Sequence, residues 1–247
     1  MTLRHPASPQ VRLETLEPRL MLSGQTFLVD SLQDVVASDG MVTLREAIEA
    51  ANTNTAVTDD VPAGSAAEMD EITFDIPALE AEAGPGNPLV IGLTEGQLNV
   101  RDSLILAAPA STGITIDAQG NSRVLYIPYT ANDVVLKNLT VTGGVSVQDG
   151  GGIFTSAHTT LVGVDVTGNT AIRYEHYKGG GIYSYGSLTM IDSTVSGNEA
   201  GEWGGGIWHG GVEPLVIVNS QIEGNTAKSG GGLFNDGQAT LINSLVH

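Results

Sequence analysis

Four aromatic residues recur at one position of a repeated phrase and are the first candidates for ligand contacts. Each follows three glycines and an Ile or Leu; they are Phe154, Tyr183, Trp208 and Phe234. If the preceding aliphatic residues point inward, strand alternation turns the four rings outward on one face. Such an exposed strip could stack on sugar rings or dock a protein, and it could equally serve stability alone. Other aromatic residues lie in adjoining turns, namely Tyr174, Tyr177, Tyr185 and Trp203.

The titratable residues of the same region do not form a catalytic pattern. A lyase needs a base and a cation beside a uronate, and a glycoside hydrolase needs two carboxylates at short range. Asp165 and Asp192 occupy unmatched positions of the repeat. The bases do not recur in register with carboxylates; they are Arg101, Arg123, Lys137, Arg173, Lys178 and Lys228. The histidines, also unmatched, are interpreted as surface residues: His158, His176 and His209. We therefore predict no catalytic residue.

The signal for a metal or cofactor is weak. Asp70, Glu71 and Asp75 could chelate a cation such as calcium, although a solvated strand edge accounts for them better. No Asp follows the glycine runs at the spacing of calcium-binding glycine-rich repeats. We predict no cofactor and no metal site, with calcium as the one alternative.

The repeated phrase itself predicts the fold. Its copies start 25 to 29 residues apart: GGGIF at 150–154, GGGIY at 179–183, GGGIW at 204–208 and GGGLF at 230–234. A second phrase follows in step: VTGN at 166–169, VSGN at 195–198 and IEGN at 222–225. Self-similarity at this period is typical of a solenoid. Short alternating strands between the glycines predict an all-β, right-handed parallel β-helix of about six coils over residues 89–247.

Alignment of the repeats assigns partners between neighbouring coils. Leu188, Met190 and Val195 correspond to Leu215, Ile217 and Ile222 respectively. The glycine runs supply positive φ angles for the corner of each coil. The asparagines of the second phrase are predicted to be structural, either as left-handed turn residues or as a ladder of side-chain amides between coils. They are Asn169, Asn198 and Asn225.

Residues 25–88 predict an N-terminal cap rather than a repeat. Strands are expected at 25–31 and 70–76, and a loop at 78–88. Between the strands, Thr43 and Glu46 have capping-box spacing before a helix at 44–52. Its apolar face comprises Leu44, Ala47, Ile48 and Ala51, and its polar face Arg45, Glu46 and Glu49. We expect this short helix to cover the exposed first coil.

Composition narrows the range of partners. The net charge is −18, and residues 25–100 hold 14 acidic side chains against Arg45 alone. An acidic chain without a basic patch is a poor candidate for binding nucleic acid or an anionic membrane surface, and we predict no nucleic-acid partner. The chain has no cysteine, and no apolar run approaches the ~20 residues of a membrane span.

The two ends of the chain differ from the repeats. Residues 1–24 carry Arg4, Arg12 and Arg19 without a long apolar stretch, and we expect a disordered, export-associated leader outside the fold. The repeat pattern stops at His247 in mid-coil. An unpaired solenoid edge predicts either a piece of a longer protein, which we favour, or end-to-end association with another subunit.

Three segments resemble known families. LEPRLML at 16–22 resembles the LEPR-XLL motif of large bacterial surface and secreted proteins, which implies export. LREAI at 44–48 resembles the CSLREA-type segment that precedes such helices, with Val42 and Thr43 in place of Cys and Ser. The two repeated phrases resemble the GGAI and FxxN repeats of polymorphic outer membrane proteins over about 138–247, with Val or Ile in place of Phe. Those proteins are surface adhesins, so the resemblance implies an adhesive role.

Together these features predict a secreted or cell-surface, outer-membrane-associated scaffold with a structural or adhesive role. Its aromatic strip is the candidate binding face for a polysaccharide or a surface protein. The alternative is a polysaccharide lyase or hydrolase of the pectate-lyase-like fold class. Neither a basic cleft nor clustered carboxylates are visible in support of that alternative, and fold class alone does not imply catalysis.

The strip hypothesis predicts the behaviour of a double variant. Trp208→Ala combined with Tyr183→Ala is expected to abolish ligand binding and to leave the thermal midpoint nearly intact, because outward-facing rings contribute little to a core. Retention on polysaccharide and thermal unfolding measure the two effects. Unchanged binding, or a collapsed fold, would remove the hypothesis.

Overall fold

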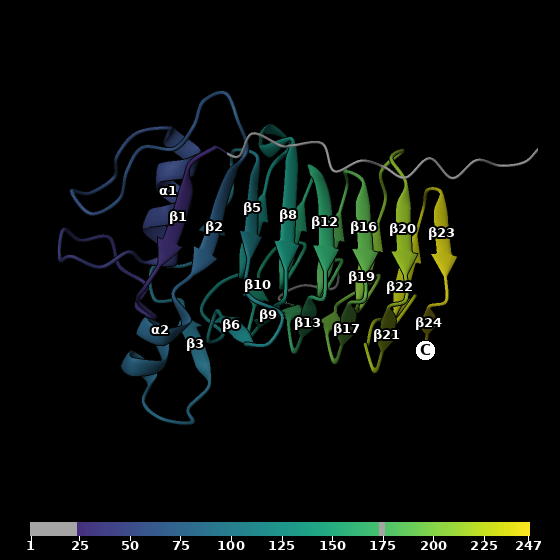
Figure 1. The fold of residues 1–247 in the computed structure, drawn as a ribbon. Coiled ribbons are helices and arrows are strands. Elements are labelled where there is room, and N and C mark those ends of the chain that lie inside the picture. The colour runs from purple at the N-terminus through teal and green to yellow at the C-terminus, as the bar shows by residue number, and fades with distance from the viewer. Residues whose placement is uncertain (1–23, 173–175) are drawn as a thin grey trace, which may run out of the picture.

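The chain winds into a solenoid of parallel β-strands with helices at its N-terminal end (Figure 1). The computed structural model describes residues 24–172 and 176–247. The leader predicted for residues 1–24 therefore lies outside the described residues, except for Gly24. Strands that are far apart in sequence lie side by side and parallel, and successive coils make about six turns. The predicted fold class, an all-β right-handed parallel β-helix with a short capping helix, is confirmed.

Three long sheets and one short sheet form the faces of the solenoid. The eight-stranded sheet contains β1 (Thr26–Val29), β2 (Asp70–Phe74), β5 (Leu104–Ala107), β8 (Asp133–Lys137), β12 (His158–Val162), β16 (Leu188–Ile191), β20 (Leu215–Val218) and β23 (Ala239–Ile242). The seven-stranded sheet contains β3 (Leu89–Gly92), β6 (Ile114–Asp117), β9 (Leu139–Thr142), β13 (Asp165–Thr167), β17 (Thr194–Ser196), β21 (Gln221–Glu223) and β24 (Leu245–Val246). The six-stranded sheet contains β4 (Leu98–Asn99), β7 (Leu125–Ile127), β11 (Ile153–Thr155), β15 (Ile182–Ser184), β19 (Ile207–His209) and β22 (Leu233–Asn235). The short sheet contains β10 (Val145–Ser146), β14 (Thr170–Ala171) and β18 (Glu199–Ala200).

Each full coil visits the sheets in a fixed order, so like residues stack on like. The chain passes from the eight-stranded to the seven-stranded sheet and returns through the six-stranded one. The predicted partners are confirmed: Leu188 pairs with Leu215, Met190 with Ile217, and Val195 with Ile222. All six side chains are buried between the sheets. Alternation along each strand thus builds one continuous apolar core along the solenoid axis.

The helix α1 (Leu44–Thr53) covers the N-terminal end of this core, beside β1 in Figure 1. Its capping box is confirmed: the Thr43 hydroxyl oxygen accepts a hydrogen bond from the Glu46 N–H, and Glu46 accepts one from the Thr43 N–H at 2.9 Å. The prediction that Arg45 and Glu46 lie on a solvated polar face is wrong, because both are buried. Glu46 is enclosed because its second carboxylate oxygen accepts the Ala37 N–H at 2.8 Å, which ties the preceding loop to the helix.

A buried ion pair fastens α1 to the first coil. Arg45 Nε lies 2.7 Å from Asp34 Oδ1, and Arg45 Nη2 donates to Asp34 Oδ2 at 2.9 Å. Arg45 also donates to the Gly96 carbonyl, and Asp34 accepts the backbone N–H groups of Thr94 and Glu95. Every oxygen of this carboxylate is therefore paired, as a buried charge requires.

Two details of the N-terminal region differ from the sequence prediction. The strands are shorter than expected and belong to the eight-stranded sheet, where β1 pairs with β2 and β2 with β5. The predicted loop at 78–88 is wrong over its first half, which forms α2 (Ile76–Ala83). Asp75 accepts the Ala78 N–H at 3.3 Å, and Pro77 occupies the first turn. An acidic N-cap followed by Pro is a helix-start signal that the prediction overlooked.

The glycine triplets are required by both conformation and contact. In the triplet 179–181, Gly179 has φ of 66°, which disfavours any side chain. A Cβ atom on Gly180 would lie 2.3 Å from the Glu199 carbonyl oxygen, and one on Gly181 would lie 2.7 Å from the Gly206 carbonyl oxygen. The triplet therefore makes the corner, as predicted, and also lets the next coil approach.

The asparagines of the second phrase form a ladder of side-chain amides, in which Asn169 and Asn198 are buried and Asn225 is half-buried. Asn169 Nδ2 donates to Asn198 Oδ1 at 3.0 Å, and Asn198 Nδ2 donates to Asn225 Oδ1 at 2.9 Å. The backbone N–H groups of Asn169 and Asn198 donate to the same two oxygens. Positive φ falls on the glycine before each asparagine instead. Two roles were predicted for these asparagines, a left-handed turn residue and an amide ladder, and the structure shows the amide ladder.

Five residues with positive φ form a separate column at the corner between the eight-stranded and seven-stranded sheets. It comprises Asn138, Gly163, Asp192, Asn219 and Asn243, with φ between 49° and 61°. Asn and Asp tolerate this conformation better than other side chains. Asp192, considered above as a catalytic carboxylate, therefore has a conformational role.

The predicted end-to-end association concerns the last coil of this sequence. β22, β23 and β24 each end their sheets, and their exposed apolar side chains are Leu241, Ile242, Leu245 and Val246. Self-association at this edge stays a prediction.

The amide ladder generates a stability prediction. Asn198→Ala should lower the free energy of unfolding by about 2–4 kcal/mol, because buried donors and acceptors on both neighbouring coils lose their partner. Gln221→Ala, a truncation of an exposed side chain on the seven-stranded sheet, should stay within about 0.5 kcal/mol of the parent. Denaturant unfolding measures both changes, and equal effects would contradict the role of the ladder.

Candidate functional site

The recurring aromatic residues stack into a continuous ladder on the six-stranded sheet. Tyr126, Phe154, Tyr183 and Trp208 follow one another in register, with ring centroids 5.1, 5.0 and 4.4 Å apart. These four residues are called the aromatic ladder. Phe234 pairs in register with Trp208, but its ring stacks on Trp203 at 5.6 Å. Tyr126 was missed because its strand, LYI, lacks the preceding glycine triplet.

The expectation that these rings form an exposed strip is wrong for Trp208. Its side chain is only 5 % exposed, and Phe154, Tyr183 and Phe234 are half-buried. The Trp208 ring folds over the next corner, where a Cβ atom on Gly210 would lie 2.0 Å from it. Since the rings stack on one another, their faces are largely occupied. A ligand-binding role for these residues stays a prediction.

Two cations complete the packing of the aromatic ladder. The Arg123 guanidinium lies 5.6 and 5.3 Å from the ring centroids of Tyr126 and Phe154, and Lys178 Nζ lies 4.5 Å from that of Trp208. Arg123 Nε also donates to the Gly150 carbonyl at 2.7 Å. Burial lowers the pKa of Arg123 to about 10, so it stays protonated at neutral pH. Both cations thus serve as cation–π contacts within the fold.

Asp149 and Tyr183 are two further titratable groups beside these rings. Asp149 accepts the Lys178 backbone N–H at 2.9 Å, and burial raises the pKa of its carboxyl group. Burial also raises the pKa of Tyr183 to about 12, and the charges of Asp149 and Tyr185 act in the same direction. A phenol with so high a pKa is a poor base at neutral pH. Tyr183 is therefore protonated at neutral pH.

An accessible groove lies at the corner where the six-stranded sheet leads into the eight-stranded sheet. It has a volume of about 350 Å³, and we call it the corner groove. Its lining residues are Tyr129, Asn132, Ser156, Ala157, His158, Tyr185, Gly186, Val212 and Glu213. They lie just before, or in the case of His158 at the first residue of, β8, β12, β16 and β20, whose upper ends in Figure 1 mark this corner. The groove therefore extends along the solenoid axis.

Two tyrosines in the corner groove have free ring surface. Tyr129 is 76 % exposed and begins the short 3₁₀ helix η1 (Tyr129–Ala131); Tyr185 is 57 % exposed and follows β15. Tyr185 was expected from the sequence as an aromatic residue of a turn, whereas Tyr129 was not singled out. Of the other turn aromatics, Tyr177 and Trp203 are half-buried, and Tyr174 lies outside the described residues.

Glycines allow the corners to stack closely below these rings. A Cβ atom on Gly186 would lie 2.2 Å from the Ala157 carbonyl oxygen, and one on Gly211 would lie 2.0 Å from the Tyr185 carbonyl oxygen. The backbone of successive corners is thus in contact. The side chains of Tyr185 and Glu213 are left at the surface.

The histidines have different environments. His158 is exposed at the start of β12, and its Nδ1 lies 2.7 Å from Ser187 Oγ. In the described part of the chain, no carboxylate lies within ion-pair distance of His158 to orient it. His209 was predicted to lie at the surface, which is wrong: it is fully buried, with Nε2 2.8 Å from the Glu213 carbonyl oxygen. His176 is exposed, as predicted.

The remaining charged candidates do not converge on one place. Asp165 is exposed on β13 and pairs in register with Thr194, not with Asp192. Arg173 lies outside the described residues. Among residues 24–172 and 176–247, no group of three His, Asp or Glu side chains is placed to hold a metal ion. Asp70 is buried and accepts backbone N–H groups of Gln25 and Ser65. Burial raises the pKa of Asp70, which those hydrogen bonds partly offset.

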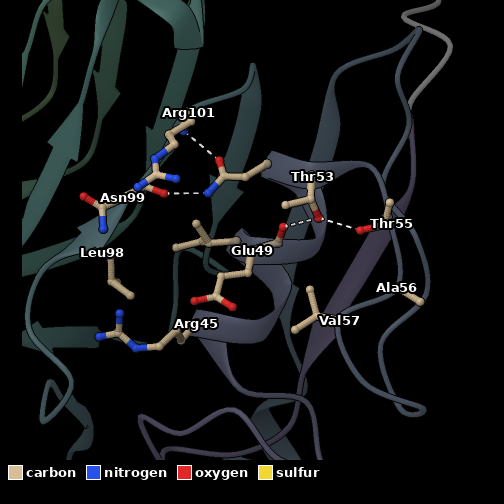
Figure 2. A pocket seen from close by; sticks show the side chains of 11 residues that line it. Arg45, Glu49, Thr53, Thr55, Ala56, Val57, Leu98, Asn99 and Arg101 are labelled. Atoms are coloured by element: carbon tan, nitrogen blue, oxygen red, sulfur yellow. Dashed lines mark hydrogen bonds between the residues drawn. The ribbon is translucent and has the colours of Figure 1, made fainter.

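A second pocket of about 280 Å³ lies between α1 and β4 (Figure 2). Its walls include Arg45, Glu49 and Arg101. Asn52, another lining residue, bridges α1 to the first coil: Nδ2 donates to the Asn99 carbonyl at 2.7 Å, and Oδ1 accepts the Arg101 N–H at 2.6 Å. These hydrogen bonds hold the capping helix against the first coil, so the pocket lies at the interface between the helix and that coil.

Fold and surface together define a right-handed parallel β-helix protein with a capped N-terminal end and a lateral groove. Comparison of the chain with known protein families, with curated proteins and with solved structures found no match. In the part of the chain that the structure describes, neither helix has the length and apolar character needed to cross a membrane.

Because Trp208 is buried, its removal should destabilise the fold, whereas an exposed ring was expected to contribute little to stability. Trp208→Ala should lower the free energy of unfolding by about 3–5 kcal/mol, because a large buried ring is lost and a cavity remains. Trp208→Phe keeps a stacked ring and removes an indole N–H that has no partner, so it should cost less than about 1.5 kcal/mol. Chemical denaturation measures both, and a neutral Trp208→Ala would show that the ring is dispensable.

Proposed function

We propose that this protein is a secreted or cell-surface β-helix scaffold that binds a linear glycan along the corner groove. The observation that carries the proposal is the pair of exposed tyrosine rings, Tyr129 and Tyr185, in a groove parallel to the solenoid axis. Flat aromatic surfaces with a polar hydroxyl edge suit stacking on sugar rings. Asn132, His158 and Glu213 add polar groups that can orient sugar hydroxyls.

The spacing of the coils favours an extended polymer over a compact ligand. Neighbouring coils lie about 4.8 Å apart, so Tyr129 and Tyr185, two coils apart, lie about 10 Å from each other along the axis. Each coil contributes its own segment of wall to the groove. A ligand with a regular repeat along its length can therefore contact several coils in the same way.

The surface location and the adhesive role rest on the sequence. The resemblance of 16–22 to an export-associated motif and of the repeats to those of surface adhesins supports them, and so do the acidic composition and the lack of cysteine. The alternative, a polysaccharide lyase or hydrolase, has less support. Glu213 is the one carboxylate among the described residues lining the groove, whereas a hydrolase needs two.

The proposal is tested by retention of the full chain on cellulose, xylan, chitin, chitosan, alginate and polygalacturonate. Tyr129→Ala combined with Tyr185→Ala should weaken retention at least about fivefold, because two stacking contacts are lost. The thermal midpoint should stay unchanged, since both rings are exposed. Phe154→Leu, which alters the aromatic ladder and leaves the groove intact, is the matched control.

Three outcomes would overturn this assignment. Retention on none of the polymers would remove glycan binding and leave a protein partner as the ligand to seek. Loss of retention in Phe154→Leu but not in the tyrosine variant would move the site to the aromatic ladder. Release of reducing or unsaturated ends by the purified protein would replace the scaffold with an enzyme.

A further inference from the structure

The charges around the corner groove are of one sign. Of the described residues that line it, none is Lys or Arg, and Glu213 is exposed within it. His158, the other titratable side chain of the lining apart from the tyrosines, is hydrogen-bonded through Nδ1 to Ser187. A ligand in the groove therefore faces a carboxylate without a compensating cation on its walls.

Residues next to the groove strengthen this acidic character. Asp133 is exposed and pairs in register with His158, so its carboxylate lies beside the groove on the preceding coil. Asp236 is exposed at the corner that follows Glu213, and its N–H donates to the His209 carbonyl at 2.9 Å. Arg101, the basic residue of the corner before Tyr129, lines the pocket beside α1 instead (Figure 2).

A polyuronate would bring one carboxylate per sugar into the acidic corner groove. Like charges repel at short range, and the chain as a whole carries −18, which also slows the approach of a polyanion. Proteins that hold acidic sugars supply Arg, Lys or a bound cation to the carboxylate. An uncharged sugar meets no such penalty, and an amino sugar is attracted.

On the basis of the proposed function, we infer that the corner groove selects glycans without acidic groups and rejects polyuronates. Uncharged or amino-bearing sugars stack on Tyr129 and Tyr185, and Glu213 with its neighbours Asp133 and Asp236 supplies the discrimination. The inference assigns a substrate class to the groove. It also separates this protein from lyases, whose chemistry requires a uronate.

The test compares affinity for uncharged, amino-bearing and acidic polymers, namely cellulose, chitosan and polygalacturonate. The full-length parent should bind polygalacturonate at least tenfold more weakly than the best of the other two. Glu213→Lys should strengthen binding to polygalacturonate about fivefold, the effect of one close charge near water, and weaken binding to chitosan. Low salt should widen these differences because screening decreases.

A matched variant separates local from global charge. Glu223→Lys makes the same change of net charge on an exposed residue of the seven-stranded sheet, away from the groove, and should alter neither affinity. Equal effects of the two variants would overturn the inference. Tighter binding of polygalacturonate than of the other polymers would overturn it while leaving glycan binding intact. Binding of no polymer would instead remove the proposed function itself.

Discussion

The in-register stacking of coils is the constraint on which the rest of the structure depends. Each coil can pair its backbone with the next only if both have the same shape at every level. One coil spacing of about 4.8 Å leaves no room for side chains where corners touch, which explains Gly180 and Gly181. The same constraint places equivalent residues above one another. The amide ladder, the aromatic ladder and the left-handed column are three consequences of one geometry.

Periodicity predicted these columns because it specifies which residues are equivalent. It could not specify how much of a ring the neighbouring coil covers, so Trp208 was expected at the surface although it is buried. Likewise, the pattern of α1 assigned Arg45 to solvent. Its actual environment depends on Asp34 and on carbonyls some fifty residues away in sequence. Burial of such groups is set by long-range contacts, which a local pattern does not contain.

The corner groove was beyond prediction for a different reason. Its residues follow strands at the points where the repeat is least regular: η1 on one coil, a short turn at Ser156, and a longer one around Val212. An alignment of the repeats does not match such variable segments with one another. The sequence therefore did not indicate that Tyr129 and Glu213 lie in the same groove. Of the groove residues, Tyr185 stood out as an aromatic residue in a turn and His158 as a surface histidine. Winding of the chain brings these unrelated segments to one edge.

The regular and the variable positions of a coil have different structural roles. Residues in the strands and at the glycine corners contact the neighbouring coils, so a substitution there disturbs the packing of those coils. The corner before the eight-stranded sheet carries segments of different length on different coils, above a base where the backbones of successive corners are in contact. Side chains above that base are free to meet a ligand. A binding site can therefore change at this corner without changing the scaffold, whereas a change in the aromatic ladder also alters the ring stacking that packs neighbouring coils together.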